Sequence, residues 1–446
     1  MATTLPPANE GKPGLGRRLG AAALWLLVLN GMVGAGIFGI PAEAARLAGA
    51  WSPALFLLTA LLVAPVLLCF SQLASGTRES GGPARYVQIA FGAQAGFQTG
   101  WALYIARLTA FAANLSLMLA AIAHFLPSLG EGPARIVALA AIVGVVATLN
   151  IVGVSWAMRS LGALTVAKLL PLLLLVVLGL AQLPAAPATV ALLPADSLGL
   201  ALGPALLLMV YAFVGFESGL IPGGEARHPA RDMPRALLGA LLLCGLLYAA
   251  LQWLCLRFVP ELATQTRPLV ALGEALLGPW GASLVLATIV ASVGGNLLSS
   301  MFAVPRVTHS LAEQGLLPRP LAAVSVRFRT PWASVLLYAV LAWALAATGS
   351  FVLLAAMSVL VRLLMYLACL ASMPAVDRQG PPDRWRLPGG PAIALLAAGV
   401  CLALLTQVEW RAVLGTAGLL AAGSLLYSVA RWQQRPVPPP GPQPPA

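Results

Sequence analysis

The sequence predicts an all-α integral membrane protein with about twelve transmembrane helices. Of the 446 residues, 60% are hydrophobic and only 9% are charged, whereas a soluble domain carries about 25% charged residues. Apolar runs long enough to cross a bilayer as a helix, about 20 residues, recur along the chain. The sequence lacks long segments of alternating polarity, which argues against a membrane barrel.

The predicted spans form two sets of six. They are expected near residues 19–46, 53–74, 95–124, 134–154, 160–182 and 200–222, then 236–258, 280–305, 332–349, 351–374, 391–409 and 412–432. The first run has no small-residue cleavage site, so we expect an uncleaved helix. Short surface helices are expected within 76–94 and 261–279. Residues 1–18 and the Pro-rich residues 433–446 are expected to be cytoplasmic tails.

The basic residues predict an orientation. With a cytoplasmic N-terminus, 18 of the 26 Lys and Arg lie in inside loops, 5 lie in outside loops, and Arg107, Lys168 and Arg362 lie within spans. This bias follows the positive-inside rule and predicts that both termini are cytoplasmic. The net charge of +12 is spread over short loops, so we expect a lipid bilayer and no nucleic acid as partner. The Ala-, Leu- and Arg-rich, Lys-poor composition indicates a GC-rich bacterial genome and hence the inner membrane.

The sequence predicts neither a cofactor nor a metal site. The five cysteines and three histidines are isolated, and none of them has metal-ligand spacing. A clustered catalytic set is also absent, so a polytopic membrane enzyme is not expected.

Two of the predicted spans are interrupted by glycine. The first contains Gly31, Gly34, Gly36 and Gly39 within nine residues, although each glycine disfavours a helix by about 1 kcal/mol relative to alanine. The sixth contains "YAFVGFESGLIPGGE" at residues 211–225. Because five spans separate the two breaks, the pattern predicts an inverted repeat of spans 1–5 and 6–10.

A break in a membrane helix exposes backbone groups that need partners. The N–H groups at a new helix N-terminus attract a carboxylate, and the freed carbonyls attract an ammonium. A zwitterionic substrate therefore fits such a site. The alternative is that these glycines serve helix packing, since "GMVG" at residues 31–34 is a small-xxx-small pattern.

Four stretches resemble the amino acid–polyamine–organocation superfamily of permeases. "VGAGIF" (33–38) is similar to its first-helix motif, and "FVGFES" with "GEARHPARDMPRAL" (213–218, 224–237) to its sixth-helix motif and the following loop. "LNIVGVSWAMRSLGALTVAKLL" (149–170) and "AVPRVTHSLAEQGLLPRPLAAVSVRFRTPWAS" (303–334) resemble its helix 4–5 region and the stretch after helix 8. The resemblance covers about residues 20–375, in order along the chain.

The resemblance implies the five-plus-five inverted-repeat fold of the leucine transporter and alternating access around a midplane site. Repeat 1 would be 19–182 and repeat 2 would be 200–374, followed by two further helices at 391–432. By position, the substrate carboxylate would lie on amides around Gly34, Ala35, Gly36 and Ile37. The ammonium would lie on carbonyls near Tyr211, Ala212, Val214 and Gly215, with Phe213 and Phe216 as lid or pocket walls. Arg107 and Arg362 depart from the family pattern.

Lys168 is one of two lysines in the chain and lies about eight residues into its span. Its side chain can reach the carbonyls of Asn30 to Val33, where sodium-coupled relatives hold a sodium ion. The hypothesis is that the Lys168 ammonium replaces sodium and exchanges a proton during transport. The alternative is a lysine that snorkels to the cytoplasmic surface.

Five further residues have two open interpretations each. Glu217, just past the second break, is either a gating proton site or a structural partner of an arginine. Arg107 and Arg362 either pair with Glu217 and carbonyls or contact a substrate carboxylate. Ser292 and Asn296 either line the coupling region or hydrogen-bond a neighbouring helix.

The leading functional hypothesis is a secondary transporter for an amino acid or related amine. Proton-coupled uptake leads, with an amino acid/polyamine exchanger or an exporter as alternatives. A non-transporting membrane sensor is a remote alternative, because such proteins usually add an output domain. The sequence predicts no oligomeric state.

Overall fold

The computed structural model describes residues 20–77, 82–123, 125–152, 161–183, 195–220, 226–313 and 315–433. The predicted tails lie outside these ranges, apart from Gln433, and so does Pro222 after the second predicted break. The described elements are all helices, which agrees with the predicted all-α class.

The first half of the chain runs from α1 to α8. Its helices are α1 (Ala21–Met32), α2 (Gly36–Ala48), η1 (Gly49–Trp51), α3 (Ser52–Ser75), α4 (Pro83–Phe91), α5 (Ala93–Ile122), η2 (Pro127–Leu129), α6 (Gly132–Val152) and α8 (Leu161–Ala181). The predicted first span is thus two helices, α1 and α2, and α4 is the surface helix predicted within 76–94.

The second half runs from α9 to α17. Its helices are α9 (Ala195–Phe213), α10 (Glu217–Leu220), α11 (Pro229–Phe258), η4 (Leu262–Thr264), α12 (Pro268–Leu277), α13 (Pro279–Glu313), η5 (Arg319–Ala322), α14 (Trp332–Thr348), α15 (Phe351–Gln379), α16 (Pro391–Leu405) and α17 (Trp410–Gln433). The predicted sixth span is likewise two pieces, α9 and α10, and α12 is the predicted second surface helix.

Local sequence explains where many helices begin. Proline occupies the first turn of α3, α4, α11, α12 and α16, where its missing N–H costs nothing and its fixed φ favours a helix. Ser350 caps α15 by accepting a hydrogen bond from the Leu353 N–H, at 3.2 Å. Among the described residues, seven helical stretches are long and apolar enough to cross a membrane, and six shorter helices are also apolar.

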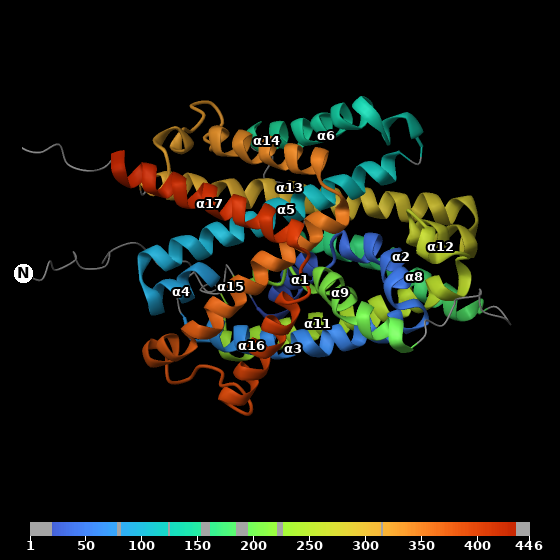
Figure 1. The fold of residues 1–446 in the computed structure, drawn as a ribbon, viewed down its shortest axis with the longest axis horizontal. Helices are drawn as coiled ribbons and strands as arrows, with labels where there is room; N and C mark the ends of the chain where they lie inside the picture. The colour runs from blue at the N-terminus through green and yellow to red at the C-terminus, as the bar shows by residue number, and fades with distance from the viewer. Residues whose placement is uncertain are drawn as a thin grey trace, which may run out of the picture.

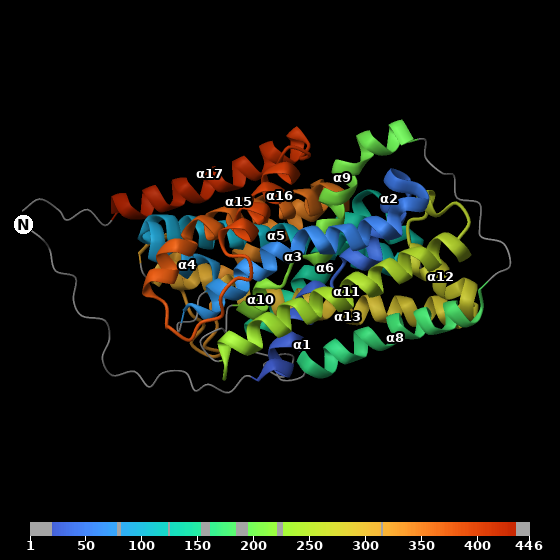
Figure 2. The same cartoon turned by 90° about the horizontal axis from the view of Figure 1, so that it is seen from below.

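The helices form an elongated bundle (Figures 1 and 2), in which α4 lies at one end and α12 lies at the other. α3 packs along α11, α5 packs along α15, and α6 packs along α14. In the most apolar stretch of α5 and of α15, 61% of the residues are buried, against 22% in α6 and 17% in α17. α6 and α17 therefore lie at the periphery, where their apolar faces suit lipid.

The two broken helices lie at the centre of the bundle. α1 packs on α10 and α11, and α2 packs on α9. Most side chains on both sides of the first break are buried, including Leu29, Val33, Ile37 and Phe38. The interruptions predicted from the glycines are confirmed, and they face one another inside the protein rather than the bilayer, as irregular backbone in a membrane requires.

Candidate functional site

The two breaks cross at Gly31 and Gly215. A Cβ atom on Gly31 would lie 2.2 Å from the Gly215 carbonyl oxygen, and a Cβ on Gly215 would lie 2.2 Å from the Gly31 oxygen. Gly215 also has a φ of +106°, a conformation that glycine adopts without strain. Both positions therefore need glycine, because the two backbones are in direct contact.

The carbonyl groups released by the first break have side-chain donors from two other helices. Lys168 Nζ, from α8, donates to Asn30 O at 2.9 Å and to Val33 O at 2.7 Å. The Tyr248 hydroxyl, from α11, donates to Met32 O at 3.1 Å. Lys168 is 1% exposed, so the contact predicted from the sequence is present and snorkelling is excluded here. Whether Lys168 titrates stays a prediction.

The amide groups at the start of α2 lie beside the crossing. α2 begins at Gly36 without a side-chain cap, so its first N–H groups lack intrahelical acceptors. A Cβ on Gly36 would lie 2.7 Å from Ala212 Cα, so α2 and α9 touch through small residues. The helix dipole and the free N–H groups make this N-terminus favourable for a carboxylate.

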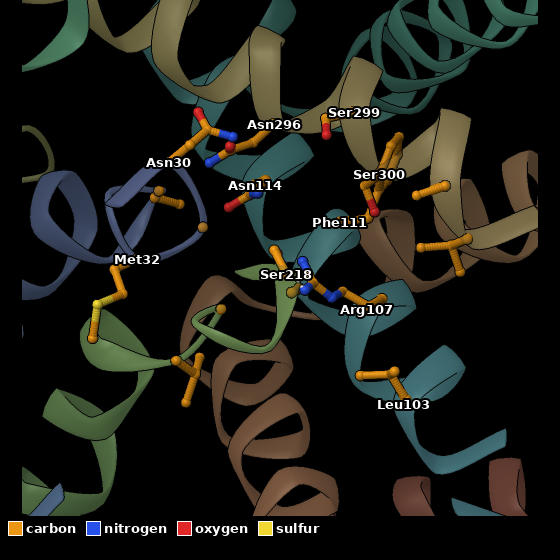
Figure 3. Close-up of a pocket in the computed structure, with 18 of the residues that line it drawn as sticks. Asn30, Met32, Leu103, Arg107, Phe111, Asn114, Ser218, Asn296, Ser299 and Ser300 are labelled. Atoms are coloured by element: carbon orange, nitrogen blue, oxygen red, sulfur yellow. Dashed lines mark hydrogen bonds between the residues drawn. The ribbon is translucent and has the colours of Figure 1, made fainter. Parts of the chain in front are cut away.

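A cavity of about 390 Å³ opens at the crossing of the breaks. Residues from α1, α2, α5, α9, α10, α13 and α15 and from the two breaks line it. Its polar wall consists largely of neutral amides and hydroxyls, those of Asn30, Tyr104, Asn114, Tyr211, Ser218, Asn296, Ser299 and Ser300. Figure 3 shows Asn30, Asn114 and Asn296 close to one another and Arg107 reaching toward Ser218. Such a mixture of apolar surface and a few convergent polar groups is typical of a small-molecule site.

The structure brings nine of the sequence-predicted residues to this wall. They are Gly34, Ala35, Gly36, Arg107, Tyr211, Val214, Gly215, Asn296 and Arg362. Ile37, Lys168, Ala212, Glu217 and Ser292 are buried around the cavity without lining it. Ser292 lies one turn before Asn296 on α13, and its Oγ has no hydrogen-bond partner among the described residues.

Phe213 and Phe216 are not among the residues that line this cavity, and their role as lid or pocket walls stays a prediction. Phe213 packs against Tyr248, with ring centroids 5.4 Å apart. Phe216 packs against Phe70 and Tyr366, at 5.5 and 5.4 Å. The turn at Gly215 directs both rings into the surrounding helices, where each is fully buried.

Glu217 belongs to a buried ion pair behind the cavity. Its Oε1 accepts a hydrogen bond from Arg362 Nε at 3.1 Å and another from the Tyr366 hydroxyl. Arg362 Nη1 also donates to Ala106 O and to Ser358 O, both at 3.1 Å, and to the Ser358 hydroxyl. Of the alternatives for Arg362, the contacts with Glu217 and with carbonyls are the ones formed. They tie α10, α5 and α15 together beneath the second break.

Arg107 has a different environment. Its Nη2 donates to Ser218 Oγ at 2.6 Å, and it forms no ion pair among the described residues. Tyr338 holds its backbone by donating to Arg107 O at 3.1 Å. The Arg107 side chain therefore stands in the cavity wall with a neutral hydroxyl as its hydrogen-bond partner.

Sequence reasoning missed several polar wall residues, chiefly Asn30, Asn114, Ser218, Ser299 and Ser300. Asn30 and Ser218 directly flank the two breaks, so their proximity to the glycines was an available signal. Asn114 lies seven residues, two helical turns, after Arg107, and this spacing places both on one face of α5. Among the described residues, no group of three or more His, Cys, Asp and Glu could hold a metal.

Three known transport proteins are similar to this chain in sequence. The serine/threonine exchanger SteT of Bacillus subtilis is 26% identical over 334 residues, which cover 72% of this chain and 74% of SteT. The branched-chain amino acid permease BcaP of the same organism is 24% identical over 449 residues, covering 94% of each chain. The cadaverine/lysine antiporter of Escherichia coli is 28% identical over 314 residues, covering 68% of each chain.

The family described as "Amino acid permease" matches residues 19–421, which include both breaks and the whole cavity wall. The match extends beyond the 20–375 stretch that carries the sequence resemblance and confirms that resemblance. The chain therefore belongs to the amino acid permease family, within the amino acid–polyamine–organocation superfamily.

Proposed function

We propose that the chain is a secondary active transporter that moves an amino acid across the bacterial inner membrane by alternating access, coupled to protons. The observation that carries the proposal is the crossing of the two breaks at Gly31 and Gly215 on the wall of a cavity. A zwitterion there has amide donors at the start of α2 and carbonyl acceptors after α9, as transport sites on discontinuous helices do.

The packing supports an inward-facing state. On the α2 side of the breaks, a Cβ on Gly39 would lie 2.7 Å from the Phe351 ring, and the Tyr211 and Phe351 rings are 5.8 Å apart. On the other side the cavity continues past Leu27, Leu103 and Val307. Leu27 precedes the break on α1, Leu103 lies toward the start of α5, which follows α4, and Val307 lies toward the end of α13, which η5 follows. The loops on that side carry the basic residues that predict a cytoplasmic location.

Lys168 is the proposed coupling residue. Its ammonium donates hydrogen bonds to Asn30 O, in the last turn of α1, and to Val33 O, the first residue after α1. If Lys168 lost its proton, these two carbonyls would no longer accept hydrogen bonds from a charged group. The contact between α8 and the first break would then be weaker. Protonation would therefore favour one geometry of the break over another, and this links a proton to the substrate site.

Two experiments test the proposal. The first is a thermal-shift screen of the purified protein against the twenty amino acids and polyamines, because a true ligand stabilises the folded state by mass action. The second measures counterflow of the hit in proteoliposomes, with and without a pH gradient. Stimulation by an inward proton gradient supports symport, while counterflow that ignores the gradient supports exchange. Absence of any ligand and any flux would contradict transport and favour a sensor.

Exchange is the second candidate. Two of the relatives are an exchanger and an antiporter by name, and exchange uses the same cavity as uptake. The counterflow experiment separates the two modes, and reversing the gradient identifies an exporter.

A further inference from the structure

We propose that the cavity selects acidic amino acids, with Arg107 holding the side-chain carboxylate, and that it excludes cationic amines. This inference rests on the proposed function and names its substrate class. It follows from the charges and the unpartnered groups of the cavity wall.

The cavity wall is positively charged. Among the residues that line the cavity in the described part of the chain, Arg107 and Arg362 are the charged ones, and no carboxylate is among them. Glu217 is close enough to act on Arg107 electrostatically, but the ion pair that it forms among the described residues is with Arg362, and its Oε1 also accepts a hydrogen bond from Tyr366. Two guanidinium groups and one carboxylate leave a net charge of +1, and the Lys168 ammonium at the first break adds to it when it is protonated.

Arg107 has donors to spare. A guanidinium carries five N–H donors in a planar fork that matches a carboxylate, and the Ser218 hydroxyl uses one of them. A cation without a counter-ion is costly inside a membrane protein. An anionic group from the substrate would offset that cost, and the fork would bind it through two parallel hydrogen bonds.

The guanidinium is held in a defined place. Ser218 Oγ, its acceptor, would lie 3.2 Å from a Cβ on Gly31, so Arg107 is anchored at the crossing of the breaks. The α5 backbone beneath it is fixed by Tyr338, which donates to Arg107 O, and by Ser358 and Arg362, which donate to Ala106 O. A rigid anchor of this kind loses little entropy when it binds a ligand.

The other two charges of an acidic amino acid also have partners on the wall. The α-carboxylate fits the uncapped N-terminus of α2, at Ala35 and Gly36. The ammonium fits beside Asn30, a residue that lines the cavity and whose buried Oδ1 accepts no hydrogen bond from the described residues. Figure 3 shows Asn30 on the opposite side of the cavity from Arg107. A dicarboxylate with one ammonium thus satisfies three groups, whereas a diamine places a second cation against Arg107.

Isosteric substrates test the proposal at neutral pH. In proteoliposomes containing the full chain, we expect glutamate or aspartate to be taken up at least about tenfold better than its amide, glutamine or asparagine, because a site built to pair a charged group rejects an analogue without it. Lysine and cadaverine are expected to show neither uptake nor competition. A wild-type protein that prefers the amide or lysine overturns the inference.

Variants assign the preference to Arg107. Arg107→Gln is expected to lose at least about tenfold in glutamate uptake while glutamine uptake is kept or increased, and Arg107→Lys is expected to keep part of the acidic preference. Arg411→Gln on α17, where Arg411 lies 5.8 Å over the Trp410 ring, is the matched control with wild-type selectivity. Equal losses for glutamate and glutamine in Arg107→Gln and Arg107→Lys would mean a structural role and overturn the inference.

Different results would contradict the proposed transport function and the proposed substrate class. If no amino acid of any charge stabilises the protein or is taken up, the proposed transport function fails. If neutral or basic amino acids are transported and acidic ones are not, transport stands and only the substrate class is wrong.

Discussion

Gly31 and Gly215 meet backbone to backbone, each leaving only 2.2 Å between a Cβ position and the other's carbonyl oxygen. Gly31 lies in the last turn of α1 and Gly215 lies in the turn between α9 and α10, and the two are 184 positions apart in the chain. The transport proposal depends on this contact, because it places the start of α2 and the end of α9 at one cavity.

Alanine at either glycine should separate the breaks. We expect Gly31→Ala and Gly215→Ala each to lower uptake at least about tenfold and to destabilise the protein by about 1–3 kcal/mol, because the methyl group overlaps backbone that has no room to move. Uptake and thermal unfolding in detergent measure both effects. Gly144→Ala on α6 is the control, since a Cβ there meets nothing within 4 Å; equal effects at all three positions would contradict the geometry.

Lys168 should control the pH dependence of transport. We expect Lys168→Gln to abolish the variation of uptake between about pH 5 and pH 8, because glutamine can donate to Asn30 O and Val33 O but cannot take up a proton. Initial uptake rates over this range provide the measurement.

Tyr248→Phe is the matched control for Lys168, since it removes the hydrogen bond to the neighbouring carbonyl, Met32 O. The lost hydrogen bond is expected to cost about 0.5–1.5 kcal/mol of stability and to leave the shape of the pH profile unchanged. If Lys168→Gln retains the wild-type profile, the coupling proposal is wrong.

The Glu217–Arg362 pair should behave as one structural unit. Glu217→Gln leaves a buried guanidinium without its counter-ion, so we expect a loss of about 3–5 kcal/mol in stability. The double variant Glu217→Gln with Arg362→Met should recover part of that loss, because no unpaired charge remains. Melting temperatures of the single and double variants form the cycle, and strictly additive losses would show that the pair does not act together.

Asn296 and Ser292 lie one turn apart on α13, and their substitution by alanine should affect ligand binding very differently. Asn296 lines the cavity, so Asn296→Ala is expected to weaken ligand binding about tenfold, as loss of one good hydrogen bond does. Ser292 is fully buried and makes no hydrogen bond among the described residues, so Ser292→Ala should leave binding unchanged and stability nearly unchanged. Ligand-induced thermal shifts measure binding to both variants. A larger loss of binding in Ser292→Ala than in Asn296→Ala would contradict the assignment of Asn296 to the cavity wall.

Much of the fold was accessible from the sequence, because a bilayer imposes strong local rules. A spanning helix must satisfy its own backbone, so spans appear as long apolar runs. The twelve predicted runs each coincide with a described helix or with the pairs α1–α2 and α9–α10. The contact of Lys168 with the first break was also predictable, since a buried lysine must find acceptors within the reach of its side chain.

The residues that line the site were harder to predict from the sequence. Phe213 and Phe216 flank Gly215 in the sequence, yet neither lines the cavity, and their rings pack against Tyr248 and Phe70 instead. Asn114 and Ser299 carry no motif and gain their place only because α5 and α13 face the same space.

Taken alone, the sequence determined the membrane class, the broken helices and the family, since each depends on the residue types within a short segment. Tertiary packing determined which residues of those segments contact one another. It paired Arg362 with Glu217 across 145 positions and left Arg107 beside Ser218 with unused donors. The two arginines look equivalent in the sequence, and their difference arises because electrostatic energy depends on which groups the fold brings within a few ångströms.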